Sequence, residues 1–491
     1  MLSVVEQKRV EVSRRTAAKK KSQLGQFLTP ATTALFMARL FQASSSRNCY
    51  LLDAGAGIGS LSSAFIEECM VGKLGLDKVA LTTFELDTSL HGELEHSLSS
   101  YIDRLSFSYE VFGGDFIEEA VNRIQFGYGA GFTHAVLNPP YKKINSNSRH
   151  RLLLRRVGIE TVNLYSAFVA LALALMAPNG QLVAIIPRSF CNGPYYRPFR
   201  EFMLSHAAIH HIHLFESRDK AFRDDAVLQE NVIILLERDC AQGNVTVTTS
   251  TDDSFTDLVT HTYPFNRIVL NDAAERTIHV PTAYERSAIE LSPAIGYSLH
   301  DLGISVSTGP VVDFRLRQHL RDMPEKGTIP LLYPAHFNGQ ETLWPKPDMK
   351  KPNAIHRNSE TEKWLFPNGH YCVVRRFSSK EEKRRIVASV VRPETFANTD
   401  ALGFENHLNV FHENKRGLPA ALAHGLSIFL NTTAVDKNFR IFSGHTQVNA
   451  TDLKLMKYPS RANLMSLGEW ALTCGELTQA MIDQQLHNLT A

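Results

Sequence analysis

The sequence predicts an α/β protein, an open sheet with helices on both faces, followed by a second α+β domain. Strand-like and helical segments alternate as far as about residue 240, a rhythm that is typical of such a sheet. Beyond that point the segments are short and β-like, and residues 324–369 hold many prolines in loop-like sequence. The 491 residues, 44% of them hydrophobic, suffice for two to three domains with sizeable cores.

The elements of the first part follow from short apolar runs and from the residues that bound them. Its first helix begins within the segment 25–41, with Thr29 as the expected N-cap and Pro30 at the first helical position. The other expected helices cover 60–70, 89–105, a stretch between 116 and 133, 163–176 and 198–207. The expected strands cover 49–55, 78–86, the start of 107–116, 133–137, 180–187, 208–215 and 231–238.

The helix expected at 163–176 is the most apolar one, but it is too short to span a bilayer comfortably. Pro178, Asn179 and Gly180 follow it and a strand comes next, so we expect a buried helix. The N-terminus lacks the charged and then apolar pattern of a signal peptide. We therefore expect a soluble, cytoplasmic protein without a membrane partner.

Net charge says little about the partners of this chain, and the cysteine pattern suggests neither a metal site nor disulfides. The chain has 52 Lys and Arg against 50 Asp and Glu, a formal net charge of only +2, so partners must be inferred from the local distribution of charge. The cysteines form no Cys-x-x-Cys pair, which predicts reduced thiols and neither a metal site nor a disulfide framework. They are Cys49, Cys69, Cys191, Cys240, Cys372 and Cys474.

A glycine-rich turn, DAGAGIG at residues 53–59, follows the first expected strand. Glycines there let a ligand approach the backbone, and the next helix offers the free N–H groups of its first turn. A dinucleotide fingerprint would need glycine at position 60, where the chain has Ser60, so an NAD-dependent oxidoreductase is disfavoured. The pattern instead resembles the first motif of S-adenosylmethionine-dependent methyltransferases, although a plain tight turn is an alternative.

Acidic residues at the ends of the next two strands strengthen this interpretation. Glu85 ends the second strand, and Asp115 and Phe116 end the third. Ligands of open α/β sheets bind at the carboxyl ends of the strands. Glu85 could accept the two ribose hydroxyls there, Asp115 could accept the adenine amino group, and Phe116 could pack on the purine. Each of these acids alone is more typical of a solvated loop. Together with Asp53 at the first strand, however, they give acids at three successive strand ends, which favours a binding site.

The fourth strand runs directly into Asn138-Pro139-Pro140-Tyr141. Two prolines stop a strand, because neither can donate to the hydrogen-bond ladder. An aromatic amine such as adenine N6 is a poor nucleophile, and two acceptors directed at its hydrogens would favour attack. The Asn138 side-chain oxygen and the Pro139 carbonyl could be these acceptors, held in place by the prolines. Tyr141 could stack on the base. The alternative is that Pro139 and Pro140 only end the strand and that the segment binds no base.

The order of these motifs resembles the gamma class of adenine-N6 DNA methyltransferases. In that class a G-Q-[FY]-x-T-P segment precedes the glycine motif, and N-P-P-Y and a target-recognition domain follow. Residues 25–30, GQFLTP, match that segment, which in the family contacts the methionine part of the cofactor. The resemblance covers about 22–236 well. Segments 306–315 and 444–459 resemble, less specifically, the C-terminal halves of restriction-modification adenine methyltransferases.

The resemblance implies a Rossmann-like, mostly parallel sheet of seven strands with one antiparallel strand. It implies a catalytic domain at 25–290 after a basic segment at 1–24, and a DNA target-recognition domain at 295–491. Methyl transfer would be direct, on a base flipped out of double-stranded DNA, and would leave S-adenosylhomocysteine. A cognate restriction endonuclease encoded nearby is a candidate partner but not a required subunit, and we expect a monomer or a dimer. A second aromatic against the base would be Phe222, with Phe215 as the alternative.

These inferences give three sets of expected site residues. The expected catalytic residues are Asn138, Pro139, Pro140, Tyr141 and Phe222. The expected cofactor-binding residues are Phe27, Thr29, Pro30, Asp53, Ala54, Gly55, Gly57, Gly59, Glu85, Asp115, Phe116 and Asn138. Two basic runs supply the expected DNA contacts, with solvated faces as the alternative. These contacts are Lys142, Lys143, Arg149, Arg151, Arg155, Arg156, Arg375 and Arg376.

Other functions compete with this interpretation. Asn-Pro-Pro-Tyr also occurs in enzymes that methylate RNA or the glutamine amide of release factors. The glutamine enzymes lack a C-terminal domain of about 200 residues, and this extra length together with GQFLTP favours DNA. A DNA-binding module without catalysis would have a broken glycine turn or a broken Asn-Pro-Pro-Tyr, and both are intact.

Overall fold

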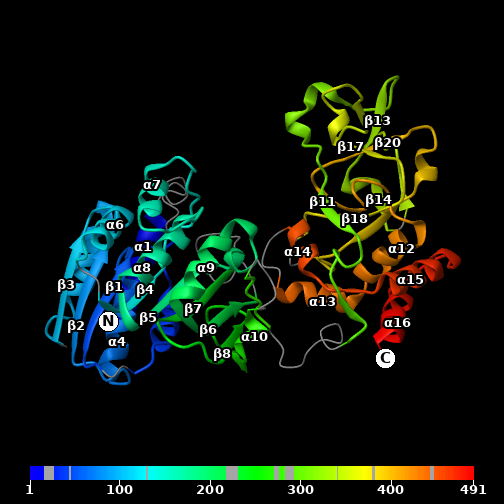
Figure 1. Cartoon of the computed structure of the whole chain (residues 1–491). Coiled ribbons are helices and arrows are strands. Elements are labelled where there is room, and N and C mark those ends of the chain that lie inside the picture. The colour runs from blue at the N-terminus through cyan, green and yellow to red at the C-terminus, as the bar shows by residue number, and fades with distance from the viewer. Residues whose placement is uncertain are drawn as a thin grey trace. The chain divides into compact units, whose positions relative to one another are not determined.

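The structure is a computed structural model of the whole chain (Figure 1). The residues that it describes are 1–15, 27–43, 46–104, 106–128, 131–216, 230–269, 276–281, 292–339, 341–378, 382–442 and 447–490. The chain divides into two compact units, Met1–Tyr284 and Glu285–Ala491. Phe222, the aromatic expected to stack on the target base, lies outside the described residues.

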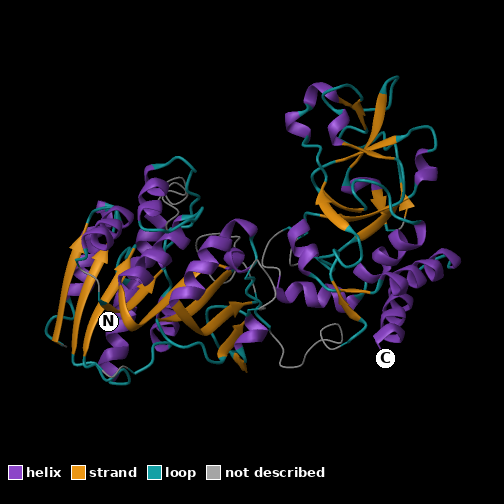
Figure 2. Cartoon of the chain, in the orientation of Figure 1, coloured by secondary structure: helices purple, strands orange, loops and turns teal. Residues whose placement is uncertain are grey.

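The first unit combines a sheet with helices (Figure 2). Its strands are β1 (Asn48–Ala54), β2 (Lys78–Phe84), β3 (Ser106–Phe112), β4 (Phe132–Leu137), β5 (Met176–Pro187), β6 (Ala207–Phe215), β7 (Asn231–Arg238), β8 (Val245–Ser250) and β9 (Val259–Tyr263). Its α-helices are α1 (Leu2–Arg15), α3 (Ala31–Arg39), α4 (Ser60–Val71), α5 (His91–Ser99), α6 (Phe116–Phe126), α7 (Arg149–Arg156), α8 (Leu164–Leu175), α9 (Arg197–His206) and α10 (Phe265–Ile268). Its 3-10 helices are η1 (Thr88–Leu90), η2 (Arg188–Cys191) and η3 (Pro194–Tyr196).

The strands of this unit form one sheet in the order β3-β2-β1-β4-β5-β7-β6-β8-β9. The strands from β3 to β5 pair in parallel. The strand β7 is antiparallel to both β5 and β6, and β6 and β8 are parallel. The predicted α/β fold with a mostly parallel sheet is therefore confirmed.

The sheet extends further than the sequence predicted, because β8 and β9 continue it beyond β6 and β9 adds a second antiparallel strand. We expected the α/β part to end near residue 240. The chain passes from β7 to β8 without a helix, so the alternation of strand and helix stops before the sheet does. The Val and Thr residues of β8 favour a strand, and β8 pairs directly with β6.

Helices cover both faces of the sheet, as predicted. Consecutive strand residues point to opposite faces. Leu51 of β1 belongs to the core that contains Phe65 of α4, whereas its neighbour Leu52 belongs to the core that contains Phe168 of α8. Nearly every residue of α8 is buried, which confirms the expected buried helix. Within the described residues, no helix has the length and apolar character needed to cross a bilayer.

The N-terminal stretch folds with the first unit. We had separated residues 1–24 as a basic segment, and its described part is the helix α1. Val5 of α1 forms a small buried cluster with Ile58 and Leu90. The helix therefore contributes to the packing around the start of α4 rather than forming a separate arm.

The second unit is a mixture of short strands and helices. Its strands are β10 (Ile295–Tyr297), β11 (Ser305–Thr308), β12 (Leu320–Arg321), β13 (Thr328–Leu332), β14 (Phe337–Asn338), β15 (Glu341–Thr342), β16 (Ala354–His356), β17 (Leu365–Pro367), β18 (Tyr371–Arg375), β19 (Ala388–Val391), β20 (Ala401–Phe404), β21 (Leu408–His412) and β22 (Tyr458–Pro459). Its α-helices are α12 (Ala420–Leu430), α13 (Thr433–Phe442), α14 (Ala450–Leu455), α15 (Arg461–Thr473) and α16 (Gln479–Thr490). Its 3-10 helices are η4 (Asp313–Arg315), η5 (Arg317–His319), η6 (Pro334–His336), η7 (Glu362–Trp364) and η8 (Pro393–Phe396).

Two larger sheets and a helical layer organise the second unit, in agreement with the expected α+β character. The sheet β11-β21-β18-β19 is antiparallel. The sheet β12-β16-β13-β20-β17 pairs β13 with β20 in parallel. The helices α12 and α15 approach closely at Gly425 and Gly468, because a Cβ on Gly425 would lie 1.7 Å from the Leu464 carbonyl oxygen.

Candidate active site

A cavity opens in the first unit at the carboxyl ends of β1 to β4. The predicted site residues that line it are Phe27, Thr29, Gly55, Gly57, Glu85, Asp115, Phe116, Asn138, Pro140 and Lys142. Lining residues that the sequence analysis did not single out include Leu28, His150 and Phe168. Parallel strands end at the same edge of a sheet, which explains why residues distant in the sequence meet there.

The glycine turn between β1 and α4 brings bare backbone to this cavity. Gly55, Gly57 and Gly59 have φ angles of +85°, +59° and +84°, which residues with a side chain rarely adopt. A Cβ on Gly57 would also lie 2.8 Å from the Cδ2 atom of Leu28. Gly59 is the N-cap of α4 and does not line the cavity. The turn therefore needs glycine both for its backbone angles and for space.

Asp53 lies near the end of β1, behind the glycine turn, and does not line the cavity. Its side chain is fully buried, and Oδ2 accepts a 2.5 Å hydrogen bond from the Ser62 hydroxyl. The Oδ1 atom is buried without a hydrogen-bond partner among the described residues. Burial raises the pKa of Asp53 to about 7. Asp53 therefore supports the glycine turn from behind and does not face the cavity.

Glu85 follows β2 and is only 4% exposed. The backbone N–H of Gly57 donates to its Oε2 at 2.8 Å, and the N–H of Asp87 donates to its Oε1 at 2.7 Å. Burial raises the pKa of Glu85, although these two bonds oppose the shift. The bonds fix the carboxylate in the cavity wall, where its oxygens have the acceptor capacity to bind a vicinal diol such as that of ribose.

Asp115 follows β3 and caps α6, and it also pairs with His150. Its Oδ1 accepts a 2.8 Å hydrogen bond from the N–H of Ile117, and its Oδ2 lies 2.8 Å from Nε2 of His150. This hydrogen bond raises the pKa of His150. Burial alone would raise the pKa of Asp115, but the bonds from His150 and from the helix lower it. His150 was missed because nothing in the sequence separates it from the arginines around it.

An apolar wall faces these acceptors. The ring of Phe116 lies between those of Phe84 and Phe168, at centroid distances of 5.2 Å and 4.9 Å. Phe84 and Phe168 line the cavity together with Phe116. A flat aromatic ligand can therefore contact carbon on its faces and acceptors at its edge, which is the arrangement that a purine needs.

Asn138 begins the Asn-Pro-Pro-Tyr turn directly after β4. Its Nδ2 donates to the Phe27 carbonyl oxygen at 2.8 Å and to the Thr29 hydroxyl at 2.9 Å. Its Oδ1 accepts a 3.3 Å hydrogen bond from the Tyr141 hydroxyl, which also lies 3.2 Å from the carbonyl oxygen of Ile185. Both ends of the amide are thus held, and the N-terminal GQFLTP segment joins the strand end through its last residues.

Several predicted site residues lie outside the cavity lining. They are Pro30, Asp53, Ala54, Gly59, Pro139 and Tyr141. The expected helix cap at Thr29 is wrong, because α3 begins at Ala31 with Pro30 as its N-cap and without a side-chain cap. The Thr29 hydroxyl accepts from Asn138 instead, so its role is in the site and not at the helix end.

The basic run after the turn forms α7 and the loop before it. Arg151 was an expected DNA contact, and this expectation is corrected by the structure. The side chain is buried and bonded to Glu160 and to the Thr161 carbonyl oxygen, so it holds the fold of this segment. Arg155 pairs with Glu160 at 3.0 Å. Arg149 pairs with Glu118 at 2.9 Å and is largely exposed.

The remaining expected DNA contacts differ in whether their charged groups are exposed or already bonded to another residue. Lys143 and Arg156 are exposed. In the second unit, Arg375 forms an ion pair with Glu382. Arg376 donates a 3.1 Å hydrogen bond to the Asn406 carbonyl oxygen. Lys143 and Arg156 can therefore reach a phosphate at less cost than Arg375 and Arg376.

Together, the parallel sheet, the bare glycine turn, the acidic groups at the next two strand ends and the aromatic wall suit an adenosine. These features define the class of S-adenosylmethionine-dependent methyltransferases. The residues present fit that cofactor, because the fixed Glu85 carboxylate, the Asp115 carboxylate and the apolar Phe116 wall lie around one cavity.

Comparisons with known proteins agree. A family model described as "Eco57I restriction-modification methylase" matches residues 78–222. Type II methyltransferase M.BsuBI of Bacillus subtilis is 52% identical over 496 residues, covering 100% of this chain and 98% of the relative. Type II methyltransferase M.PstI of Providencia stuartii is 41% identical over 472 residues, covering 94% and 92%. The solved structure of the DrdV–DNA complex shares the fold, with a TM-score of 0.53 and 12% identity over 93% of this chain and 58% of that one.

This chain belongs to the type II methyltransferases of restriction-modification systems. The family predicted from the order of the motifs is thereby confirmed, as is S-adenosylmethionine as the methyl donor.

Proposed function

We propose that this enzyme transfers the methyl group of S-adenosylmethionine to N6 of an adenine in double-stranded DNA, at a specific sequence. The observation that carries the proposal is the fixed orientation of the Asn138 amide at the edge of the cavity. Both hydrogens of Nδ2 are engaged, one by the Phe27 carbonyl oxygen and one by the Thr29 hydroxyl. The Oδ1 atom is therefore the one that can accept a hydrogen bond from an incoming amine.

The acceptors answer the main chemical difficulty of this reaction. The lone pair of an adenine amine is delocalised into the ring, so the amine attacks poorly until it becomes pyramidal. Two acceptors directed at its hydrogens favour that form. Asn138 Oδ1 is one acceptor and the Pro139 carbonyl is the other. Because Pro139 and Pro140 restrict the backbone, both acceptors are in place before the reaction and little reorganisation is needed.

The Tyr141 hydroxyl controls one of these acceptors. It lies within hydrogen-bond distance of both Asn138 Oδ1 and the Ile185 carbonyl oxygen. A hydroxyl has one hydrogen, so it donates to one of them at a time. When it donates to Ile185, the oxygen of Asn138 is left to the amine. The ring of Tyr141 lies outside the cavity lining, next to Asn138 and Pro140, and is the face on which we propose that the flipped base stacks.

The transfer itself needs position more than acid–base chemistry. Bound S-adenosylmethionine supplies an electrophilic methyl group on sulfur. The amine would take this methyl group, sulfur would keep the electron pair of the broken bond and leave as S-adenosylhomocysteine, and the amine would lose a proton to water. Asn138 and the turn hold the amine in line with the methyl, which is an entropic contribution to the rate. The adenine must leave the duplex to reach this place.

We infer that DNA approaches from the side of residues 142–156. Lys142 lines the cavity, so the basic run begins at the site of transfer. The exposed Lys143 and Arg156 can contact phosphates whatever the sequence. Sequence choice then requires contacts to base edges near the target adenine. We propose that the second unit, Glu285–Ala491, supplies them.

Sequencing that detects modified bases directly tests the proposal. The full chain is expressed in cells that lack adenine methylation, and the control strain carries the variant Asn138→Ala. We expect N6-methyladenine at one recurring sequence with the wild type and none with the variant. Methylated cytosine would overturn the proposal. So would unmodified DNA combined with methyl transfer by the purified enzyme to RNA or to a release-factor glutamine.

A further inference from the structure

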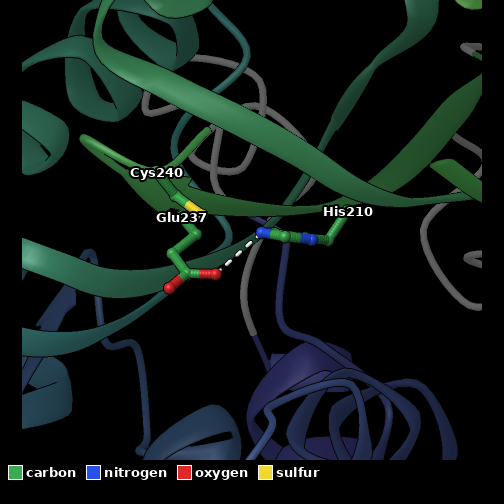
Figure 3. A group of neighbouring side chains, drawn as sticks. All are labelled: His210, Glu237 and Cys240. Atoms are coloured by element: carbon green, nitrogen blue, oxygen red, sulfur yellow. Dashed lines mark ion pairs between the residues drawn. The ribbon is translucent and has the colours of Figure 1, made fainter. Parts of the chain in front are cut away.

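Three side chains of different chemistry lie close together at one place in the first unit, away from the cavity. They are His210 of β6, Glu237 of β7 and Cys240 just after β7 (Figure 3). Their ligand atoms, one imidazole nitrogen, one carboxylate oxygen and one sulfur, all lie within 4.8 Å of one another. The imidazole and the carboxylate face each other in the picture, and the sulfur lies beside them.

Two backbone irregularities create this convergence. The register between β6 and β7 shifts between Ile209 and His211, so His210 is the extra residue of a β-bulge. A bulge turns one side chain away from the regular alternation of the strand. After β7, Asp239 has a φ of +53°, a left-handed conformation that is uncommon for residues other than glycine. This turn returns the chain so that Cys240 lies beside Glu237.

The contact between His210 and Glu237 is close but lacks the direction of a hydrogen bond. The His210 Nε2 atom lies 2.7 Å from Glu237 Oε2. The same nitrogen is buried and has no hydrogen-bond partner among the described residues. An unsatisfied imidazole nitrogen beside a carboxylate and a thiol is a costly arrangement for a plain ion pair. The same arrangement suits a metal ion, because the imidazole nitrogen can donate its lone pair to the ion.

The chemistry of the three donors selects the kind of metal. Imidazole and thiolate are ligands of Zn²⁺ and of similar transition metals, whereas Mg²⁺ and Ca²⁺ prefer oxygen. Bond lengths of about 2.0–2.3 Å place tetrahedral ligand atoms about 3.3–3.6 Å apart. In such a site the 2.7 Å between His210 Nε2 and Glu237 Oε2 would widen by about 0.6 Å, and the three ligand atoms already lie within 4.8 Å of one another.

We propose that His210, Glu237 and Cys240 bind one Zn²⁺ ion, or a transition metal of the same class, with water at the fourth position. The ion would join β6 to the segment that follows β7. Glu237 pairs in register with Gln181 of β5, which in turn pairs with His134 of β4. This row lies toward the amino ends of the parallel strands, whereas the cofactor cavity lies at their carboxyl ends. The ion therefore stabilises the sheet and takes no part in methyl transfer.

Cobalt substitution in the full chain tests the proposal without relying on methyl transfer. The chain is stripped with a chelator and titrated with Co²⁺, which gives a thiolate-to-metal absorption band when a cysteine binds it. We expect one equivalent bound with this band, loss of the band in Cys240→Ser, and an unchanged band in Cys474→Ser. Cys474 is the matched control because its exposure is also intermediate. A wild-type chain without the band, or a band that survives Cys240→Ser, overturns the proposal.

A second measurement remains decisive if Cys240→Ser does not fold. In the wild-type chain, Zn²⁺ should slow alkylation of Cys240 at least tenfold, measured on peptides by mass spectrometry, and leave Cys474 unaffected. It should raise the melting temperature by at least about 3 °C, because it binds the native state. The affinity for S-adenosylmethionine should stay within twofold. Equal protection of both cysteines, or none of Cys240, would contradict the proposed site.

Discussion

Thr29 offers the finest test of the site, because in the reaction that we propose it acts through Asn138. Replacing Thr29 by Val removes one of the two acceptors that orient the Asn138 amide. One such hydrogen bond contributes about 1–1.5 kcal/mol, so we expect kcat to fall about tenfold. Thr29→Ser keeps the hydroxyl and should remain near wild type. Initial rates on DNA that carries the recognition site measure both variants.

The same experiment includes its own check on Asn138. Asn138→Ala should lower kcat more than a hundredfold, since it removes the acceptor itself, a loss of more than about 2.7 kcal/mol in transition-state binding. Because Thr29 also lines the cavity, calorimetry on both Thr29 variants separates any loss of affinity for S-adenosylmethionine from the expected fall in kcat. If Thr29→Val and Thr29→Ser have equal kcat, the amide does not depend on this bond. An Asn138→Ala enzyme with more than about a tenth of wild-type turnover would exclude its role as acceptor.

Asp53 gives a prediction about pH. Its pKa is raised by burial from its ordinary value to about 7, so the folded state binds the proton more tightly than the unfolded state. Burial destabilises the ionised carboxylate of Asp53 but not its neutral form. The free energy of unfolding therefore falls as pH rises from about 4 to 7 and the proton is lost. Asp53→Asn removes this dependence and should raise the free energy of unfolding at pH 8 by about 1–3 kcal/mol.

Urea unfolding of wild type and Asp53→Asn from pH 4 to 8 measures that difference, and other titrating groups cancel in the comparison. The two stability curves should diverge with rising pH and run parallel above about pH 8. Curves that stay parallel throughout would mean that Asp53 is charged in the folded free enzyme. That result would contradict both the raised pKa of Asp53 and the burial of its side chain as the cause.

Some site residues could be predicted from the sequence because their chemistry is local. Glu85 and Asn138 directly follow a strand and Asp115 comes three residues after one, and parallel strands end at one edge, so strand order alone brings them together. His150 could not be found this way, because its partner Asp115 is 35 residues away on another element. The trio of His210, Glu237 and Cys240 depends on a bulge and a left-handed residue, and neither leaves a recognisable spacing.

At the scale of elements, α7 carries one arginine that holds the fold and another that is exposed to solvent. Arg151 is buried against Glu160 and Thr161, whereas Arg156 on the same helix is exposed. Arg151→Met should lower the free energy of unfolding by about 2 kcal/mol, because it leaves the buried Thr161 carbonyl oxygen without its donor and leaves Glu160 paired with Arg155 alone. Arg156→Ala should leave stability unchanged but reduce the salt dependence of DNA binding, by a slope of about 0.9 for one lost phosphate contact.

Urea unfolding and DNA affinity at several salt concentrations distinguish the two variants. A salt slope that falls with Arg151→Met and not with Arg156→Ala would reverse the assignment. From the sequence both arginines are expected DNA contacts, because a charge run does not show which side of a helix packs. Arg151 bonds Glu160 and the Thr161 carbonyl oxygen, which lie beyond the end of α7, so the pattern of the helix alone does not predict its burial.

Element prediction succeeded where an apolar run and its boundaries agree. The helix α8 and the strands β1 to β7 were placed to within a few residues, because each is apolar and ends at a turn residue or an acid. The strands β8 and β9 were not assigned to the sheet. Their Thr-rich sequence is equally compatible with an edge of this sheet and with a new domain, and only pairing with β6 decides between these.

At the scale of the whole molecule, the two units have separate cores. Each hydrophobic cluster formed by the described residues lies entirely within Met1–Tyr284 or within Glu285–Ala491. The cofactor cavity belongs to the first unit alone. One flipped adenine cannot define a site, so discrimination must come from contacts to neighbouring base edges, each good bidentate pair contributing about 1–3 kcal/mol. The division of cores makes it possible to exchange one function without the other.

We therefore expect a chimera to separate chemistry from sequence choice. The chain up to Tyr284 is joined to the matching second unit of a type II methyltransferase with a different recognition site. Because the cavity is unchanged, its affinity for S-adenosylmethionine should stay within about threefold of wild type, a difference of about 0.7 kcal/mol. Because the base contacts are exchanged, methylation in cells should move to the donor's sequence, as read by sequencing that detects N6-methyladenine. The reciprocal chimera serves as the control and should methylate the original sequence. A folded chimera that keeps its original sequence would place recognition in the first unit, with the loop and helix at 142–156 as the first place to look.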